Sequence, residues 1–197
     1  MATVTKTWTF PSNSNGWTEV GDDAGEAFGF TDVGAQAVQF TRPTAGTSSE
    51  RARTGAGVTW ETWGVPSGAT VNSIIFSAST CRNATSGITT TNIKGRIVDS
   101  SNTTILVGGD SLDSSFSGTS YVTRSGTSKD INSSYQSSTT NIKAEMTGNI
   151  TSTSTNRGWR SNSISVQITY STTPSFTAKA RRFFSNLVNR IGTRTVK

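Results

Sequence analysis

Residues 58–79, VTWETWGVPSGATVNSIIFSAS, decide the fold of this chain. The first part, through Trp63, is rich in β-branched and aromatic residues, which favour strands. Pro66-Ser67-Gly68 predicts a tight turn, because proline presets one backbone dihedral and glycine accepts a positive φ. The β pattern then resumes from Thr70 to Phe76. The stretch therefore predicts a strand, a tight turn and a returning strand.

The same pattern extends to both ends of the chain. Residues 3–10 and 163–170 alternate, with Val4, Lys6, Trp8 and Phe10 on one face of the first segment and threonines on the other, which predicts strands with one buried face. Shorter strands are predicted at 36–41, 93–98, 103–107 and 141–146. The polar segments 43–57, 80–91 and 108–118 are interpreted as loops. The sequence TTNIK occurs at 90–94 and again at 139–143, which suggests strands in related positions of two sheets.

The composition predicts an all-β domain. Serine and threonine make up about a third of the chain, far above ordinary usage, while five Trp and nine Phe provide a core. With about eight to ten short strands, the expected fold is a two-sheet, jelly-roll-like sandwich. We expect one sandwich domain over residues 1–170, a linker over 171–177 and a tail over 178–197.

The net charge of +6 is concentrated in the tail. Residues 1–170 contain all twelve acidic residues and twelve of the eighteen basic ones, so the body is neutral. The tail supplies the remaining basic residues and no acidic one. A neutral body gives no support to nucleic-acid binding by the sandwich.

The tail contains the only strong helix signal. Residues 178–191, AKARRFFSNLVNRI, place apolar side chains on one face and basic and polar ones opposite, and Gly192 follows as a stop. A helix of this length is marginal alone, so its apolar face needs a partner. That partner is the sandwich itself, another protein or a second copy, a membrane surface, or nucleic acid. The residues predicted to bind a partner are Lys179, Arg181, Arg182, Phe183, Phe184, Leu187, Val188, Arg190 and Ile191.

The residue types argue against catalysis. The chain has no histidine, which removes the commonest general base and histidine-bearing zinc sites, and its single cysteine, Cys81, is expected to be a small buried residue. We expect a protein that is not an enzyme and needs no cofactor. Asp22, Asp23 and Glu26 form a weak calcium candidate in a glycine-rich segment. No apolar run is long enough to span a membrane, and residues 1–10 do not read as a signal segment.

The segment GVPSGATV at 64–71 resembles a hairpin edge of jelly-roll β-sandwich modules, which include many virion proteins of tailed bacteriophages. The resemblance implies a structural component of a phage particle. The expected type is a capsid decoration or cement protein, or a fibre protein, that binds the shell without covalent bonds. Its expected partners are the major capsid protein or another virion protein, and the resemblance implies an oligomer, guessed as a trimer. We expect it in the virion, assembled in the host cytoplasm.

The alternative is a carbohydrate-binding module or a receptor-binding tail-fibre domain. The opening TWTFPSNSNGW at 7–17 is similar to the first strand of several carbohydrate-binding and lectin-like sandwiches. Sugar faces pack on aromatic rings, and the candidates for that role are Trp17, Trp60, Trp63, Trp159 and Tyr121. Trp159, inside the loop-like NRGWR, and Tyr121 are the predicted stacking residues.

Overall fold

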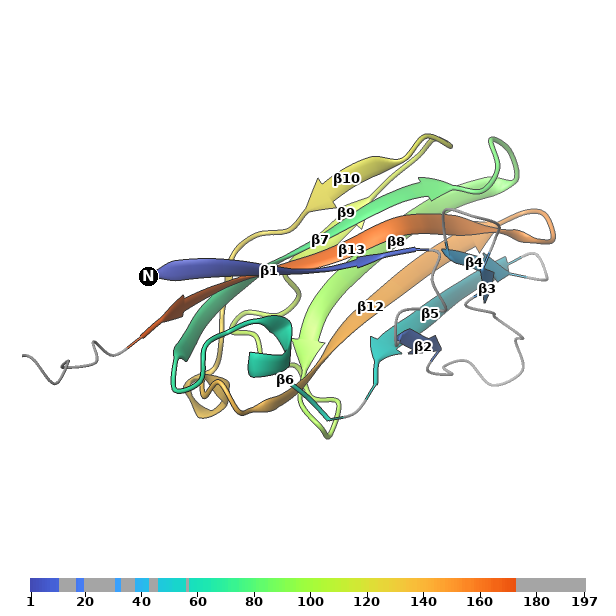
Figure 1. Ribbon diagram of the computed structural model, residues 1–197. Coiled ribbons are helices and arrows are strands. Elements are labelled where there is room, and N and C mark those ends of the chain that lie inside the picture. The colour runs from blue at the N-terminus through green and yellow to red at the C-terminus, as the bar shows by residue number, and fades with distance from the viewer. Residues whose placement is uncertain (11–16, 20–30, 33–37, 43–45, 56, 173–197) are drawn as a thin grey trace, which may run out of the picture.

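Two antiparallel sheets packed face to face form the protein, as the computed structural model in Figure 1 shows. The structure describes residues 1–10, 17–19, 31–32, 38–42, 46–55 and 57–172. This arrangement confirms the predicted two-sheet, jelly-roll-like β-sandwich. The predicted C-terminal helix lies outside the described residues. No helix in the described part of the chain is both long and apolar enough to cross a membrane.

Sheet A contains seven strands centred on β13. Its order is β10 (Val122–Ser125), β7 (Thr70–Arg82), β13 (Arg157–Ser171), β4 (Val38–Arg42) and β3 (Thr31–Asp32). In addition, β1 (Ala2–Thr9) pairs with β13, and β11 (Lys129–Asp130) pairs with β7. The predicted strands at both ends of the sandwich domain are therefore hydrogen-bonded to each other.

Sheet B contains six strands centred on β12. Its order is β2 (Trp17–Glu19), β5 (Gly46–Thr54), β12 (Asn141–Ser152), β8 (Ile88–Val98) and β9 (Leu112–Ser115), and β6 (Val58–Thr59) also pairs with β12. The two TTNIK copies lie on β8 and at the start of β12. They are thus neighbours within one sheet, and the prediction that they occupy different sheets is wrong.

The inward faces of the two sheets form one core, and glycines let large rings fit between them. Alternate residues of β13, Ile164, Val166 and Ile168, are fully buried, as the alternation predicted. A side chain at Gly148 on β12 would overlap the Trp159 ring of β13. Gly95 on β8 faces the ring of Phe76 in the same way. The aromatic ring of one sheet therefore fills the space that a glycine of the other sheet leaves open.

The deciding stretch forms a corner between the sheets instead of a hairpin. The tight turn is confirmed, because the Ala69 N–H donates to the Pro66 carbonyl (3.1 Å) and Gly68 has a φ of 74°. The strands on either side do not pair with each other: β6 pairs with β12 of sheet B, whereas β7 pairs with β13 of sheet A. A short 3-10 helix, η2 (Glu61–Trp63), bridges the change of sheet.

Other boundaries also differ from prediction. Residues 43–57 were expected to form a loop, but β5 occupies 46–54 and pairs with both β2 and β12. In the predicted loop 108–118, β9 forms over four residues. Conversely, the expected strand at 103–107 is reduced to isolated bridges from Thr104 and Leu106. A second 3-10 helix, η3 (Ser133–Tyr135), precedes β12.

The turn after β8 predicts a pH dependence of stability. Asp99 Oδ1 accepts hydrogen bonds from the N–H groups of Ser101 and Thr103 (both 2.9 Å), and Oδ2 accepts one from the Tyr135 hydroxyl (3.0 Å). These hydrogen bonds lower the pKa of Asp99, and the bond from Thr103 is the largest cause. A carboxyl whose pKa is lower in the folded state stabilises it above its unfolded pKa of about 3.9 and loses that contribution as the pH falls.

We therefore expect Asp99→Asn to destabilise the protein more at pH 6 than at pH 3. Urea denaturation of the wild type and the variant at both pH values measures the difference. Asp130→Asn, at an exposed carboxylate, is the control. A gap between the wild type and Asp99→Asn that is equal at both pH values would contradict the assignment.

Candidate functional site

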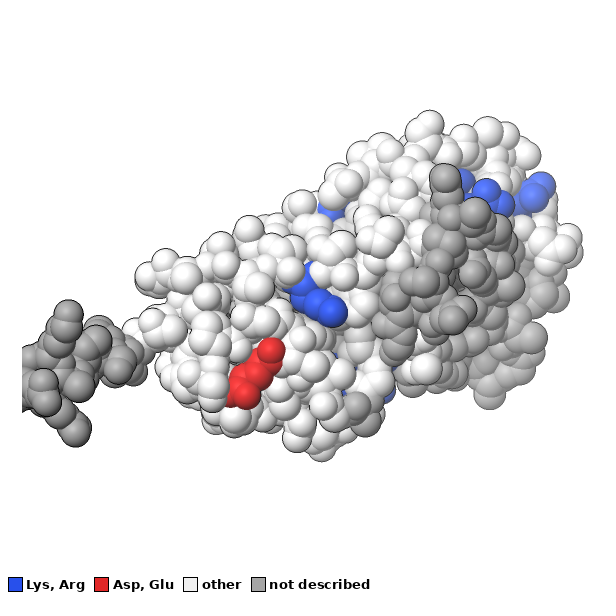
Figure 2. Space-filling view, in the orientation of Figure 1, with Lys and Arg blue, Asp and Glu red and all other residues white. Residues whose placement is uncertain are grey.

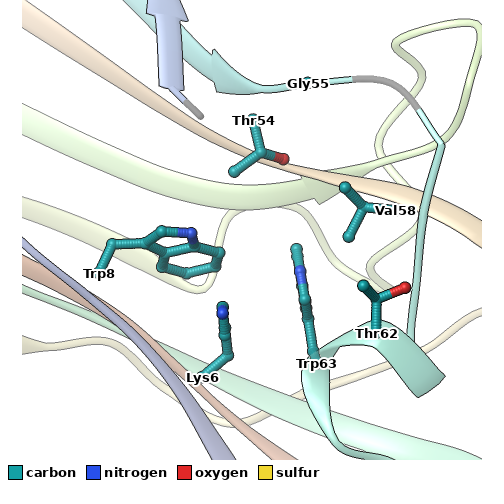
Figure 3. Close-up of a pocket in the computed structure, with 7 residues that line it drawn as sticks. All are labelled: Lys6, Trp8, Thr54, Gly55, Val58, Thr62 and Trp63. Carbon is teal, nitrogen blue, oxygen red and sulfur yellow. The ribbon is translucent and has the colours of Figure 1, made fainter. Parts of the chain in front are cut away.

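A pocket of about 240 Å³ opens where the edge of sheet A meets the corner after β5. Figure 3 shows its lining, which comes from β1, the end of β5, β6 and η2: Lys6, Trp8, Thr54, Gly55, Val58, Thr62 and Trp63. Both sheets and the inter-sheet corner thus contribute to it, so the pocket depends on the folded sandwich.

Tryptophan rings build the inner wall. Trp8 meets Trp63 edge to face, with ring centroids 5.3 Å apart, and Trp17 in the same manner at 5.4 Å. Trp60 packs edge to face on Trp63 at 5.7 Å. All four rings are buried, so only small parts of Trp8 and Trp63 face the pocket.

Lys6 supplies the pocket's charge. Its ammonium lies 5.7 Å from the centroid of the Trp8 ring, and among the described residues it has no carboxylate partner. The two hydroxyl groups are already engaged: Thr54 Oγ1 accepts from the Ala144 N–H (3.0 Å), and Thr62 Oγ1 accepts from the Thr59 N–H (3.0 Å). Lys6 is therefore the main polar group left for a ligand.

This arrangement, a mainly apolar lining with one cation, is suited to holding a small ligand. The seven lining residues include no carboxylate, cysteine or histidine that could act as a base or nucleophile. A small ligand with an apolar face and one hydrogen-bond acceptor would match the ring edges and the ammonium. The pocket's volume of about 240 Å³ is slightly below the ordinary range of ligand pockets, which begins at about 300 Å³.

A second cluster of polar groups lies on the outer face of sheet B, around Glu145. This side chain points away from the core, yet its residue is 0% exposed. Its two oxygens accept from Arg53 Nε (2.7 Å) and Arg96 Nε (2.8 Å), one arginine on each neighbouring strand. Arg51 approaches to 3.7 Å. We interpret this cluster as a clamp that joins β5, β12 and β8.

The acidic residues next to the clamp take up further basic groups. Asp110 lies 3.9 Å from Arg96 and 3.8 Å from Lys94, and Asp113 lies 3.3 Å from Lys94. A hydrogen bond from Asn92 is the largest cause that lowers the pKa of Asp113. The ionic groups on this face therefore contact one another.

The two predicted stacking residues have different outcomes. Trp159 is 1% exposed, so its assignment as an exposed platform is wrong. It points inward over Gly148, which could not be inferred from the flanking arginines. Tyr121 is 38% exposed and keeps part of its ring accessible, so its role stays a prediction. The other three candidate tryptophans, Trp17, Trp60 and Trp63, are also buried, which removes them as stacking platforms.

The remaining predicted sites have the following positions. The tail residues Lys179 to Ile191 and the calcium candidates Asp22, Asp23 and Glu26 lie outside the described residues. Within the described part of the chain, no group of three potential ligands is close enough to hold a metal ion. Cys81 is buried as expected, and burial raises the pKa of its thiol.

Sequence reasoning missed the pocket because its residues are distant in the chain. The alternation in β1 predicts that Lys6 and Trp8 lie on one face, so this part of the pocket could be inferred from the sequence. That Trp63 closes the pocket follows only from the corner between the sheets, which the expected hairpin would not have formed.

Comparisons with known proteins concern the fold alone. No protein-family model and no curated protein matches the chain. The tandem CBM22-1–CBM22-2 domain of Paenibacillus barcinonensis Xyn10C is similar at 13% identity and a TM-score of 0.48, over 89% of this chain and 49% of that one. The arabinose-bound MgGH51 α-L-arabinofuranosidase is similar at 10% identity and 0.47, over 80% and 24%.

A phage protein is also among the similar structures. The enzymatically active domain of tailspike protein 4 from bacteriophage CBA120 is similar at 15% identity and a TM-score of 0.43, over 78% of this chain and 19% of that one. In all three cases this chain spans less than half of the other protein's length.

Proposed function

We propose that this protein is a structural component of a bacteriophage particle, most closely a capsid decoration or cement protein, and that it acts by association and not by catalysis. The proposal combines the virion-protein resemblance of residues 64–71 with one structural observation. The largest ionic cluster of the described sandwich, around Glu145, is paired internally, and the basic tail carries all of the net charge, so the tail is the charged contact that we assign to a partner.

The pairing of charges in the body supports this division of roles. The largest group of ionic residues is the clamp around Glu145 on sheet B. On the outer face of sheet A, Thr5 and Thr7 of β1 lie beside Gln167 and Ser165 of β13. These four side chains are polar and uncharged. Figure 2 shows that the described surface in this view carries few charged groups.

The tail has the properties of an anchor. Its sequence predicts a helix with an apolar stripe that includes Phe183, Phe184 and Leu187, and six basic residues without an acidic one. Buried aromatic side chains supply most of the energy in protein interfaces, while charged residues steer association and set its salt dependence. An acidic, partly apolar patch on a capsid protein would match both features.

Removing the tail is expected to abolish binding to particles. We would incubate the full chain, and a chain ending at Thr173, with phage particles that lack the protein, and then measure co-sedimentation across a salt series. Phe183→Ala/Phe184→Ala is expected to weaken binding about 100-fold or more, because each buried ring contributes about 1.5–3 kcal/mol. The double variant Arg181→Gln/Arg182→Gln should mainly make particle binding less dependent on the salt concentration.

The matched control replaces Lys129, a basic residue of the sandwich, by glutamine and should bind like the wild type. Saturable binding of the full chain that the truncation loses would support a tail-anchored decoration protein. Equal binding of the full and truncated chains would contradict the proposed anchor. No binding of either chain would contradict the virion assignment itself.

Carbohydrate binding is the second candidate, and the pocket at Lys6 and Trp8 favours it. A sugar unit has an apolar face for the ring edges and acceptor oxygens for the ammonium. Titration of the chain with glycans, followed by tryptophan fluorescence, tests this candidate directly. Lys6→Met keeps the apolar stem and removes the charge, so it should weaken a genuine ligand while leaving the fold unchanged. An unchanged affinity would exclude this pocket.

A further inference from the structure

The free edge of β1 is the longest strand edge that lacks a partner in the described structure. β1 pairs with β13 in an uninterrupted register from Ala2 opposite Tyr170 to Thr9 opposite Ser163, and no described strand pairs with the other edge of residues 2–8. The strand therefore extends about 27 Å, at about 3.4 Å per residue. Figure 1 shows β1 lying along β13.

The register identifies which backbone groups face outward. The Phe10 N–H donates to the carbonyl of Asn162, the residue opposite it, at 3.0 Å. In an antiparallel ladder, opposite residues alternate between hydrogen-bonded and non-hydrogen-bonded pairs. The even-numbered residues of β1 therefore bond to β13, and the odd-numbered residues direct their N–H and C=O groups toward the free edge.

These outward groups are available for pairing. Thr3, Thr5 and Thr7 are exposed, and no hydrogen bond from the described residues reaches their outward backbone groups. Natural proteins protect an edge with short strands, proline, bulges or charges. The described edge strands β2, β9 and β10 are short, with three or four residues each, whereas β1 has eight residues and no proline or bulge.

We propose that this edge pairs with the same edge of a second copy of the chain, antiparallel, with a two-fold axis at Thr5. Thr5 then lies opposite the second copy's Thr5, and Thr3 lies opposite its Thr7. Threonine pairs of this kind are favourable across strands. The two copies would form one continuous sheet, and each of these pairs would exchange two backbone hydrogen bonds.

The charge on the strand is compatible with this register. A lysine on an edge strand ordinarily discourages pairing. Here the two-fold axis at Thr5 places Lys6 opposite the second copy's Val4, so the two ammonium groups do not meet. Lys6 also folds over its own Trp8 ring, away from the outward backbone groups. A two-fold interface makes a dimer, in place of the trimer that the resemblance implies.

Cysteine cross-linking tests the register. Thr5→Cys is expected to form a disulfide-linked dimer under mild oxidation, because opposite residues of a hydrogen-bonded pair lie about 5.5 Å apart at Cα. A dimer made only of Thr3→Cys chains, or only of Thr7→Cys chains, should not cross-link, because the two equivalent cysteines of the dimer would lie about 14 Å apart. A mixture of the two variants should cross-link. The wild type, whose Cys81 is buried, is the control for the native thiol.

A second measurement does not depend on cysteine. Sedimentation should give the wild type twice the mass of 20.8 kDa, and Thr5→Pro, which removes only an outward N–H, should weaken dimerisation at least about tenfold. Thr5→Ala keeps that donor and should remain dimeric. Equal thermal unfolding of both variants would show that the fold is intact.

Three outcomes would overturn the proposal: a wild-type monomer at about 100 μM, a dimer unaffected by Thr5→Pro, or cross-linking that is no faster at Thr5 than at Thr3 and Thr7. A monomer whose Thr5→Pro variant loses particle binding would assign the edge to another particle protein. In this proposal, truncation of the tail leaves the dimer intact. A failure of the dimer proposal can therefore be distinguished from a failure of the proposed tail anchor.

Discussion

Glu145→Gln is expected to lower the free energy of unfolding by about 3–5 kcal/mol, the cost of breaking a buried ion pair by removing one partner. The carboxylate is 0% exposed and joins Arg53 and Arg96 across three strands. Arg53 is itself only 7% exposed, so the change leaves its guanidinium charge buried without a counter-charge. Urea denaturation, with the slope of the transition compared between variants, measures the effect.

Two further variants separate the clamp from a general effect of charge. Asp113→Asn removes a carboxylate from the exposed pair with Lys94 and should cost less than about 1 kcal/mol. The double variant Glu145→Leu/Arg53→Met replaces the buried pair with apolar side chains and should recover most of the loss, because such replacements are often neutral or stabilising. A cost below about 1 kcal/mol for Glu145→Gln would contradict a buried clamp.

Trp60→Ala is expected to cost about 3–5 kcal/mol, the range for large-to-small changes at fully buried aromatic residues. Trp60 is 0% exposed, packs edge to face on Trp63, and donates from Nε1 to the Tyr135 carbonyl at 3.0 Å. The ring thus fixes the corner between the sheets to the segment before β12. Its loss removes packing from Trp63 and leaves a carbonyl without its donor.

Trp60→Phe distinguishes the two contributions. Phenylalanine retains much of the ring packing but cannot donate, so we expect a cost of about 1–3 kcal/mol from the unsatisfied carbonyl. Val122→Ala, at an exposed position of β10, should remain within about 0.5 kcal/mol of the wild type. Chemical denaturation of the four proteins checks the series, and equal costs for Trp60→Ala and Val122→Ala would contradict the role assigned to the corner.

Residues 46–54 show why part of the fold could not be predicted. The sequence GTSSERART has no apolar alternation, and its arginines at 51 and 53 point outward toward Glu145. Its strand conformation is set by pairing with β12, whose partner residues lie about a hundred positions later in the chain. Strand formation depends strongly on such neighbours, and a window of a few residues contains no information about them.

The candidate pocket likewise combines features that the local sequence predicts with one that depends on distant residues. The alternation of β1 predicted that Lys6 and Trp8 share a face, and their place in the pocket confirms it. The turn at Pro66–Gly68 was also predictable, since its dihedral requirements are local. The closure of the pocket by Trp63 was not, because it depends on the chain crossing between sheets at η2.

We could predict the all-β class, the inward faces of β1 and β13, the neutral body and the basic tail, because alternation and charge are properties of neighbouring residues. The folded structure was needed to show that Glu145 is a buried clamp, that Trp159 lies over Gly148 and that β1 has a free edge. Each of these depends on which strands meet and in which register. Register is a long-range property, because a shift of one residue exchanges the two faces of a strand.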